Sequence, residues 1–278
     1  MKPSARKRLT GCALSLFALF LGLIVIFPLL YGVLGAFRSN AEFAAKPPAL
    51  LPASFAYTQN FVDVWLKVPI PRYFLNSLII SLLTASVRML CAVLAAYAVA
   101  FYEFRGKDLL FFIVLATMML PADTLVITNY RTVARLGLLD TYLGMSVVSF
   151  AGAGAMFMLR QRFIMFPREI RDAGRIDGCG DMRFLWDVLM PICRPVVSAL
   201  FAQSFINAWN AYLWPLLVTN RDVMRPIQVG ITMLSTYEDT NYYLMLAGVT
   251  VAMIPAVILF LLLRRSITRA MTDSSLVG

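Results

Sequence analysis

Long apolar stretches are the feature that most constrains how this chain can fold. A helix needs roughly 20 mostly apolar residues to cross the hydrocarbon core of a bilayer. Six stretches reach that length or come close to it, and the only charges inside them are Arg88 and Asp123. They are residues 9–37, 73–101, 109–130, 141–159, 195–220 and 240–263. We therefore predict an all-α, polytopic membrane protein with six transmembrane helices.

Composition excludes several other classes of protein. Of the 278 residues, 60% are hydrophobic and 14% are charged, against about half and a quarter in an ordinary soluble domain. Histidine is absent, which rules out His-ligated zinc and acid–base catalysis by histidine. The four cysteines have no CxxC spacing, so neither a disulfide framework nor a redox motif is indicated. We expect no catalytic residue, bound cofactor or metal site in this chain.

Basic residues predict the orientation of the spans. With the N-terminus inside, the inside segments hold 16 Lys and Arg residues and the outside segments hold eight. This bias favours both termini in the cytoplasm. Residues 1–8 then form a cytoplasmic N-terminus, and residues 9–278 form the membrane domain, with a short surface helix near 60–66 outside. The same distribution explains most of the net charge of +10, so the expected partner is a lipid bilayer and not nucleic acid.

The inside loop at 160–194 is unusually charged, with seven arginines and five acidic residues. Gly178 and Gly180 predict a break between two short helices. Pro167 and Glu169 suit the first turn of the first helix. The pattern alone leaves open a simpler interpretation, an amphipathic helix that rests on lipid headgroups.

This loop resembles the EAA loop of the membrane subunits of bacterial binding-protein-dependent ABC importers. That pattern is Glu-Ala-Ala, three residues, Gly, nine residues, then Ile-x-Leu-Pro. The chain fills it without a gap, with Asp172, Ala173 and Gly174, then Gly178, then Val188, Leu189, Met190 and Pro191. The departures are Asp for Glu, Gly for Ala, Val for Ile and Met for Leu. Gly174 weakens its helix by roughly 1 kcal/mol relative to alanine.

Further motifs are similar to those of the carbohydrate-uptake branch of this family, which includes maltose-type and glycerol-3-phosphate-type permeases. They are Asn76 with Ser77, and residues 136–144, 175–178 and 209–216. The similarity covers nearly the whole chain. It implies the type I ABC importer permease fold in a bacterial cytoplasmic (inner) membrane, and a sugar or a glycerol-3-phosphate-like solute.

The resemblance also implies partners. They are a second, different permease subunit, two ATP-binding cassette ATPase subunits that bind the ATP, and an extracytoplasmic solute-binding protein. The outside segment 221–243 resembles the one that reaches into the binding protein. A separate ATPase agrees with the sequence, which has no GxxxxGK[ST] phosphate loop. The residues implied to couple to the ATPase are Asp172, Ala173, Gly174, Arg175, Asp177, Gly178 and Pro191.

A polar path through the membrane has candidates in the fifth stretch. Gln203, Asn207 and Asn210 share one helical face, and Tyr212 follows them. Polar residues within a span usually face protein or water. Trp209, Tyr212 and Trp214 have the chemistry to stack on a sugar ring. The alternative is that these residues hold helices together and form an interfacial aromatic belt.

Arg88 is a further candidate for the path, because it lies near the middle of the second stretch. An arginine there costs on the order of 3 kcal/mol to insert, so it needs a partner or a wet cavity. Two interpretations stay open. The guanidinium contacts an anionic, phosphate-bearing solute, or it forms a structural pair with Asp123.

Two other functions remain as alternatives. A secondary, ion-coupled transporter would leave a cytoplasmic docking loop unexplained, and such proteins often show internal repeats, which this chain lacks. A membrane-embedded enzyme would need a catalytic constellation. The chain has no GxSxG, no HExxH and no pair of carboxylates within one span.

Overall fold

The computed structural model describes residues 5–39, 41–42, 51–234 and 242–273. Within these ranges every regular element is a helix. Four helical runs there are long and apolar enough to cross a membrane: Leu14–Gly35, Ile70–Phe101, Asp181–Trp209 and Tyr243–Leu262. A fifth span results if Tyr142–Ser149 and Ala153–Ile164, which meet at an angle of 51°, are counted as one broken helix. The chain divides into two compact units.

The first unit comprises Met1–Ile70 and Gly230–Ile254. Its helices are α1 (Ala5–Gly35), α3 (Gln59–Lys67), the end of α13 (Ile227–Met233) and the first part of α14 (Tyr242–Asp273). The helix α3 confirms the surface helix expected near 60–66. The buried side chain of Asn60 fixes it by donating to the carbonyl oxygens of Ala36, at 2.8 Å, and Arg38, at 2.7 Å. Trp65 and Leu66 of α3 remain exposed.

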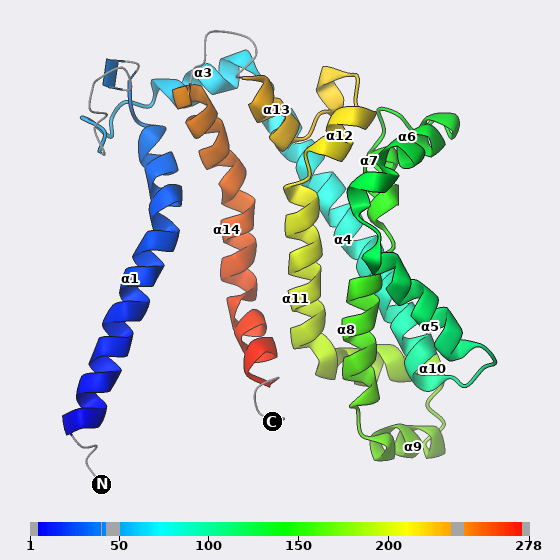
Figure 1. Ribbon diagram of the computed structural model, residues 1–278. Coiled ribbons are helices and arrows are strands. Elements are labelled where there is room, and N and C mark those ends of the chain that lie inside the picture. Colours follow the sequence, from blue (N-terminus) through cyan, green and yellow to red (C-terminus); the bar gives the residue numbers. More distant parts are fainter. Residues whose placement is uncertain (1–4, 40, 43–50, 235–241, 274–278) are drawn as a thin grey trace. The chain divides into compact units, whose positions relative to one another are not determined.

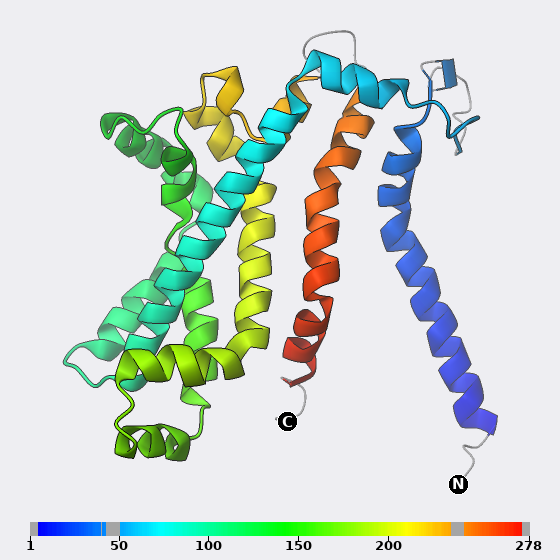
Figure 2. The ribbon, with the colours of Figure 1, turned by 180° about the vertical axis from the view of Figure 1, so that it is seen from behind.

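The second unit comprises Pro71–Val229 and Pro255–Gly278. Its long helices are α4 (Ile70–Phe101), which begins one residue before the unit, α11 (Met190–Trp209), and the second part of α14 from Pro255. The shorter elements are α5 (Lys107–Ala116), η1 (Thr117–Met119), η2 (Ala122–Leu125), α6 (Val126–Arg135), α7 (Tyr142–Ser146), η3 (Val147–Ser149), α8 (Ala153–Ile164), α9 (Arg168–Ile176), α10 (Asp181–Arg183), η4 (Phe184–Leu189), α12 (Leu213–Val218) and η5 (Asp222–Met224). Within this unit, α9 lies at the opposite end from α6 and α12 (Figures 1 and 2).

Two apolar clusters hold this second unit together. The larger one joins the second half of α4 to α8, η4 and the start of α11, with Tyr97, Leu159, Phe163, Leu185 and Leu189 almost fully buried. A smaller cluster lies at the other end and includes Ile80, Val133, Met145, Val218 and Met224. The helix α4 contributes to both clusters, so it connects the two ends of the unit.

The third apolar stretch, 109–130, does not form the single helix that the sequence predicts. The helix α5 ends at Ala116, and two short 3-10 turns lead to α6. Pro121 explains the break, because proline cannot donate to a helical ladder and pushes the residue before it out of helical conformation. Leu120 is accordingly extended, with φ −83° and ψ 121°. The count of six spans therefore stays a prediction.

The loop at 160–194 does break into two helices, as predicted. The helix α9 ends at Ile176, and the chain becomes helical again at Asp181. From there α10, η4 and α11 follow one another as a single run to Trp209. The turn η4 is π-helical. It precedes Pro191, which has no N–H to donate to the helix ladder.

Candidate functional site

The helix α9 carries most of the loop residues that the sequence singles out. Its N-cap is Pro167, one residue before the first helical turn where the sequence placed it, and Glu169 lies in that turn. Among the predicted coupling residues, Asp172, Ala173, Arg175 and Asp177 are exposed. The side chain of Ile176, at the end of α9, is 87% exposed. The structure thus places these residues together on an accessible surface, whereas Pro191 lies apart from them in the first turn of α11.

Gly178 ends α9 through its backbone conformation. Its φ is +74°, in the left-handed region that side chains disfavour. The amide of Gly178 donates to the Arg175 carbonyl at 3.1 Å, and the amide of Cys179 donates to the Gly174 carbonyl at 2.8 Å. These two bonds form a Schellman motif, which favours glycine at this position. A Cβ on Gly178 would meet no atom of the described chain within 4 Å, so conformation, and not crowding inside the chain, requires the glycine.

The loop is attached to the end of α4 by polar contacts. Arg171 of α9 donates from Nη2 to the Phe101 carbonyl oxygen at 3.1 Å, and its guanidinium lies 4.8 Å from the centre of the Phe101 ring. The hydroxyl of Tyr102 donates to Oδ2 of Asp181 at 2.6 Å. This hydrogen bond to a carboxylate raises the pKa of the Tyr102 hydroxyl. Arg171, Tyr102 and Asp181 were not among the predicted residues, since no motif in the sequence marks the pairing of α4 with the loop.

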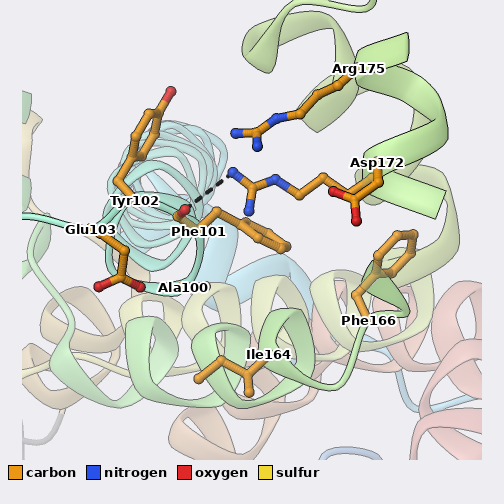
Figure 3. A pocket seen from close by; sticks show the side chains of 9 residues that line it. Ala100, Phe101, Tyr102, Glu103, Ile164, Phe166, Asp172 and Arg175 are labelled. Atoms are coloured by element: carbon orange, nitrogen blue, oxygen red, sulfur yellow. Dashed lines mark hydrogen bonds between the residues drawn. The ribbon is translucent and has the colours of Figure 1, made fainter. Parts of the chain in front are cut away.

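A pocket of about 540 Å³ lies between α9 and the end of α4. Figure 3 shows Phe101 and Tyr102 on one side and Asp172 and Arg175 on the other, with the guanidinium of Arg175 pointing toward α4. Phe166 lines the same pocket. The dashed line in Figure 3 is the hydrogen bond from Arg171 to Phe101.

Arg88 contacts the bent helix pair α7–α8. Its Nε donates to the Ser149 carbonyl oxygen at 2.7 Å. Ser149 is the last residue of η3, where carbonyl groups lack a partner in the helix. Gly152, just before α8, leaves room for the side chain, because a Cβ there would lie 3.1 Å from Cδ of Arg88. The side chain of Asp123, the partner considered from the sequence, lies outside the described residues.

The four candidate path residues of the fifth apolar stretch are exposed in this chain. Gln203, Asn207, Asn210 and Tyr212 are all exposed. Oδ1 of Asn210 accepts a hydrogen bond from Nε2 of Gln228 at 3.4 Å. The predicted common face of Gln203, Asn207 and Asn210 is therefore accessible, and its three members belong to α11 or to the residue that ends it.

The two tryptophans suggested for sugar stacking both make contacts within the chain. Trp209 is 1% exposed, and its ring stacks on Phe205 with the centres 5.9 Å apart. Trp214 donates from Nε1 to the Gly144 carbonyl oxygen at 3.2 Å. Of the aromatic residues named for that role, Tyr212 is the one that remains exposed.

The remaining motif residues meet at the α6 and α12 end of the second unit. Nδ2 of Asn76 donates to the carbonyl oxygens of Val223, at 2.9 Å, and Arg225, at 3.0 Å. Asp140 has a φ of 56°, and its Oδ1 accepts from the amides of residues 220 and 221 at 2.7 and 2.8 Å. Motifs that are far apart in the sequence thus hold one loop, 219–225, in place.

Comparison with known proteins decides the family. Residues 88–273 match the family described as "Binding-protein-dependent transport system inner membrane component". The chain belongs to this family. The resemblance seen in the sequence is confirmed, and the permease is a multi-pass protein of the inner membrane.

Relatives and solved structures agree. The sn-glycerol-3-phosphate transport system permease protein UgpE of Yersinia pestis bv. Antiqua (strain Antiqua) is 32% identical over 260 residues, which cover 91% of this chain and 92% of the relative. UgpE of Agrobacterium fabrum (strain C58) is 32% identical over 266 residues, with 92% and 94% covered. The permease has the fold of a chain from the crystal structure of a bacterial ABC transporter involved in the import of the acidic polysaccharide alginate. The TM-score is 0.82 at 19% identity, with 95% of this chain and 99% of that chain covered.

The permease is therefore a transport subunit of an ABC importer and not an enzyme. ATP hydrolysis belongs to a separate ATPase subunit, and a solute-binding protein delivers the solute in such systems. The two alternatives from the sequence, a secondary transporter and a membrane-embedded enzyme, do not agree with this family.

Proposed function

We propose that this permease is one of two different permease chains in an importer for a sugar or a glycerol-3-phosphate-like solute. Two ATPase subunits and one extracytoplasmic solute-binding protein complete the complex. The phosphate-bearing class of solute is favoured, because the relatives that are 32% identical over nine-tenths of the chain are named as sn-glycerol-3-phosphate permeases.

The exposed helix α9 is the observation that carries the coupling role. An ATPase on a separate chain needs an accessible element to hold, and α9 presents Asp172, Arg175 and the apolar Ile176 outside the chain's own core. We assign docking to this helix together with Ala173, Gly174, Asp177 and Gly178. Pro191 acts indirectly, since it lies at the start of α11 and follows the π-helical turn η4. The segment from 160 to 194 is called the coupling loop below.

The topology that fits this role has six spans and both termini in the cytoplasm. The coupling loop is then cytoplasmic, as the bias of basic residues predicts. Figure 1 supports this arrangement within the second unit, because α9 lies at one end and α6 and α12 at the other. Residues 235–241 of the segment expected to reach the binding protein lie outside the described part of the chain.

The exposed polar face of α11 forms part of the solute path. Gln203, Asn207 and Asn210 would be expensive to leave in lipid, so this face is turned toward water or toward the second permease.

Arg88, by contrast, is assigned a structural role. Its contact with the Ser149 carbonyl holds the break between η3 and α8, and a charged donor suits the carbonyl end of a helical turn.

Reconstitution tests the proposal. The permease would be co-expressed with the second permease and the ATPase of the same importer, and the purified complex would be placed in proteoliposomes with its binding protein. We expect uptake of labelled sn-glycerol-3-phosphate that requires ATP, at a constant ion gradient. Uptake that persists without ATP would contradict an ATP-driven importer, and uptake of maltose alone would contradict the phosphate-bearing solute class.

A variant pair tests the assignment of α9. Asp172→Lys reverses the charge of an exposed residue, so it should leave membrane insertion intact and lower the amount of ATPase that co-purifies. Asp63→Lys is the control, because it reverses the charge of a half-buried acidic residue of α3 in the first unit. Equal recovery of the ATPase with both variants would exclude α9 as the docking element.

A further inference from the structure

The end of α4 and the coupling loop are joined at two points by side chains that are distant in sequence. Tyr102 lies 79 positions before Asp181, and Phe101 lies 70 positions before Arg171. We call these four residues the α4 clasp. In one contact the end of α4 donates a hydrogen bond to the loop, and in the other the loop donates a hydrogen bond to α4. The two segments therefore bind each other through both contacts.

The first contact of the α4 clasp depends on a single oxygen atom. The Tyr102 hydroxyl donates to Oδ2 of Asp181 at 2.6 Å, a short, charge-assisted hydrogen bond. The Tyr97 hydroxyl approaches Oδ1 of the same carboxylate at 3.5 Å. The Tyr102 side chain is 40% exposed, so its hydroxyl can be removed without opening a cavity in the core.

The second contact closes the end of the helix. The last carbonyl groups of any helix lack hydrogen-bond donors within the helix. Arg171 supplies a donor to the carbonyl of Phe101, the final residue of α4. The guanidinium also lies over the ring of the same phenylalanine. Lateral packing supports the contact, because the Phe184 ring of η4 meets the Phe101 and Phe166 rings nearly edge-on, at 6.4 and 6.0 Å.

The two contacts connect α4 to the coupling loop, so that a movement of the loop can be passed on to α4. Asp181 opens the helical run that continues through η4 into α11, and Arg171 belongs to α9. At its middle, α4 reaches the bent α7–α8 pair through the contact between Arg88 and Ser149. A displacement of α9 that moves the end of α4 therefore also reaches the centre of the apolar region.

We infer that the α4 clasp transmits the movement of the ATPase-docked loop to α4, and that it stays closed through the transport cycle. Tyr102 and Asp181 are positioning residues in this role, because they act through the contact between α4 and the coupling loop. This inference rests on the proposed coupling function of α9. It predicts that opening the clasp separates ATP hydrolysis from transport without preventing assembly.

Tyr102→Phe in the reconstituted complex tests the inference. Loss of a hydrogen bond to a charged group shifts a two-state equilibrium by about tenfold, so the number of solute molecules imported per ATP hydrolysed should fall severalfold at unchanged yield. Asp181→Asn keeps an oxygen that can accept the hydrogen bond from Tyr102, so this variant should retain most of the wild-type ratio of solute imported to ATP hydrolysed. Tyr57→Phe is the matched control, since Tyr57 is another exposed tyrosine, in the first unit, and should behave as wild type.

A cross-link provides an independent measurement. In a background without cysteines, Tyr102→Cys with Asp181→Cys should uncouple transport, and a short bifunctional thiol reagent should restore the ratio because the clasp is closed again. A cross-link that blocks transport would overturn the inference that the clasp stays closed. A wild-type ratio for Tyr102→Phe would overturn its transmitting role. Failure of the wild-type complex to import with ATP would instead reject the proposed function.

Discussion

Arg88 of α4 donates a 2.7 Å hydrogen bond from Nε to the carbonyl oxygen of Ser149, the last residue before the break between α7–η3 and α8. The contact explains how a charged residue is accommodated near the middle of an apolar helix. Its neighbours on α4 are small, and Ser81, Thr84, Ala85 and Ala92 are buried. The guanidinium thus lies against protein, next to the glycine at 152 that leaves room for it.

We expect Arg88→Leu to lower the stability of the permease. The substitution removes the donor of the half-buried Ser149 carbonyl, which costs up to about 1–3 kcal/mol. Arg88→Lys should recover part of the loss, because it keeps a charged donor without the planar fork. Thermal unfolding in detergent and the yield of assembled complex are the measurements. Normal stability of Arg88→Leu, with uptake lost for a phosphate-bearing solute alone, would instead assign Arg88 to the solute.

The partner considered from the sequence needs its own variant. If Arg88 also pairs with Asp123, each single neutral variant strands a buried charge, and Arg88→Leu with Asp123→Leu should recover expression. If Ser149 is the main partner, the double variant should be no more stable than Arg88→Leu alone. Expression levels of the three variants distinguish the two outcomes.

Substitutions at Gly178 should follow backbone conformation. Its φ of +74° costs an ordinary side chain roughly 1–2 kcal/mol, whereas asparagine tolerates the left-handed region. Gly178→Asn should therefore lower the melting temperature of the permease less than Gly178→Val does.

Gly178→Trp tests the contact of this residue with the ATPase. The variant should remain in the membrane, since no atom of the described chain crowds the position, but the ATPase should no longer co-purify with it. Normal transport by the Trp variant would reject Gly178 as an ATPase contact.

Gly144→Ala should be among the most disruptive small substitutions in the chain. A Cβ at this position would overlap with the backbone carbonyl oxygen of Leu138, and a backbone atom has little freedom to move away. We expect a loss of several kcal/mol, as for other severe steric changes. Gly22→Ala is the matched control, because Gly22 lies inside α1 with open space around it and alanine favours a helix. Equal yields of the two variants would contradict this geometry.

Cysteine labelling tests the topology. Val223 is exposed in η5, so Val223→Cys in a cysteine-free background should react with an impermeant thiol reagent in intact cells. A variant that keeps Cys179 alone should react only after the cells are permeabilised. The opposite pattern would place the coupling loop outside and reverse the predicted orientation.

The sequence by itself determined the class of protein, the family and the composition of the coupling loop. Apolar length and the spacing of short motifs are local properties, and each can be recognised along the chain without knowledge of its partners. The break at Gly178 and Gly180 belongs to this group, because the left-handed end of α9 is encoded within six residues. The surface helix α3 was predictable for the same reason.

Only the tertiary structure decided how these segments contact one another. The bonds from Arg88 to Ser149 and from Tyr102 to Asp181 connect residues 61 and 79 positions apart. Their formation depends on which helices pack side by side, and no local sequence pattern predicts this packing. The burial of Trp209 against Phe205 likewise separated a structural aromatic residue from the exposed Tyr212. Helix packing sets these choices, because it determines which polar groups find a partner inside the chain and which remain available to solute or to another subunit.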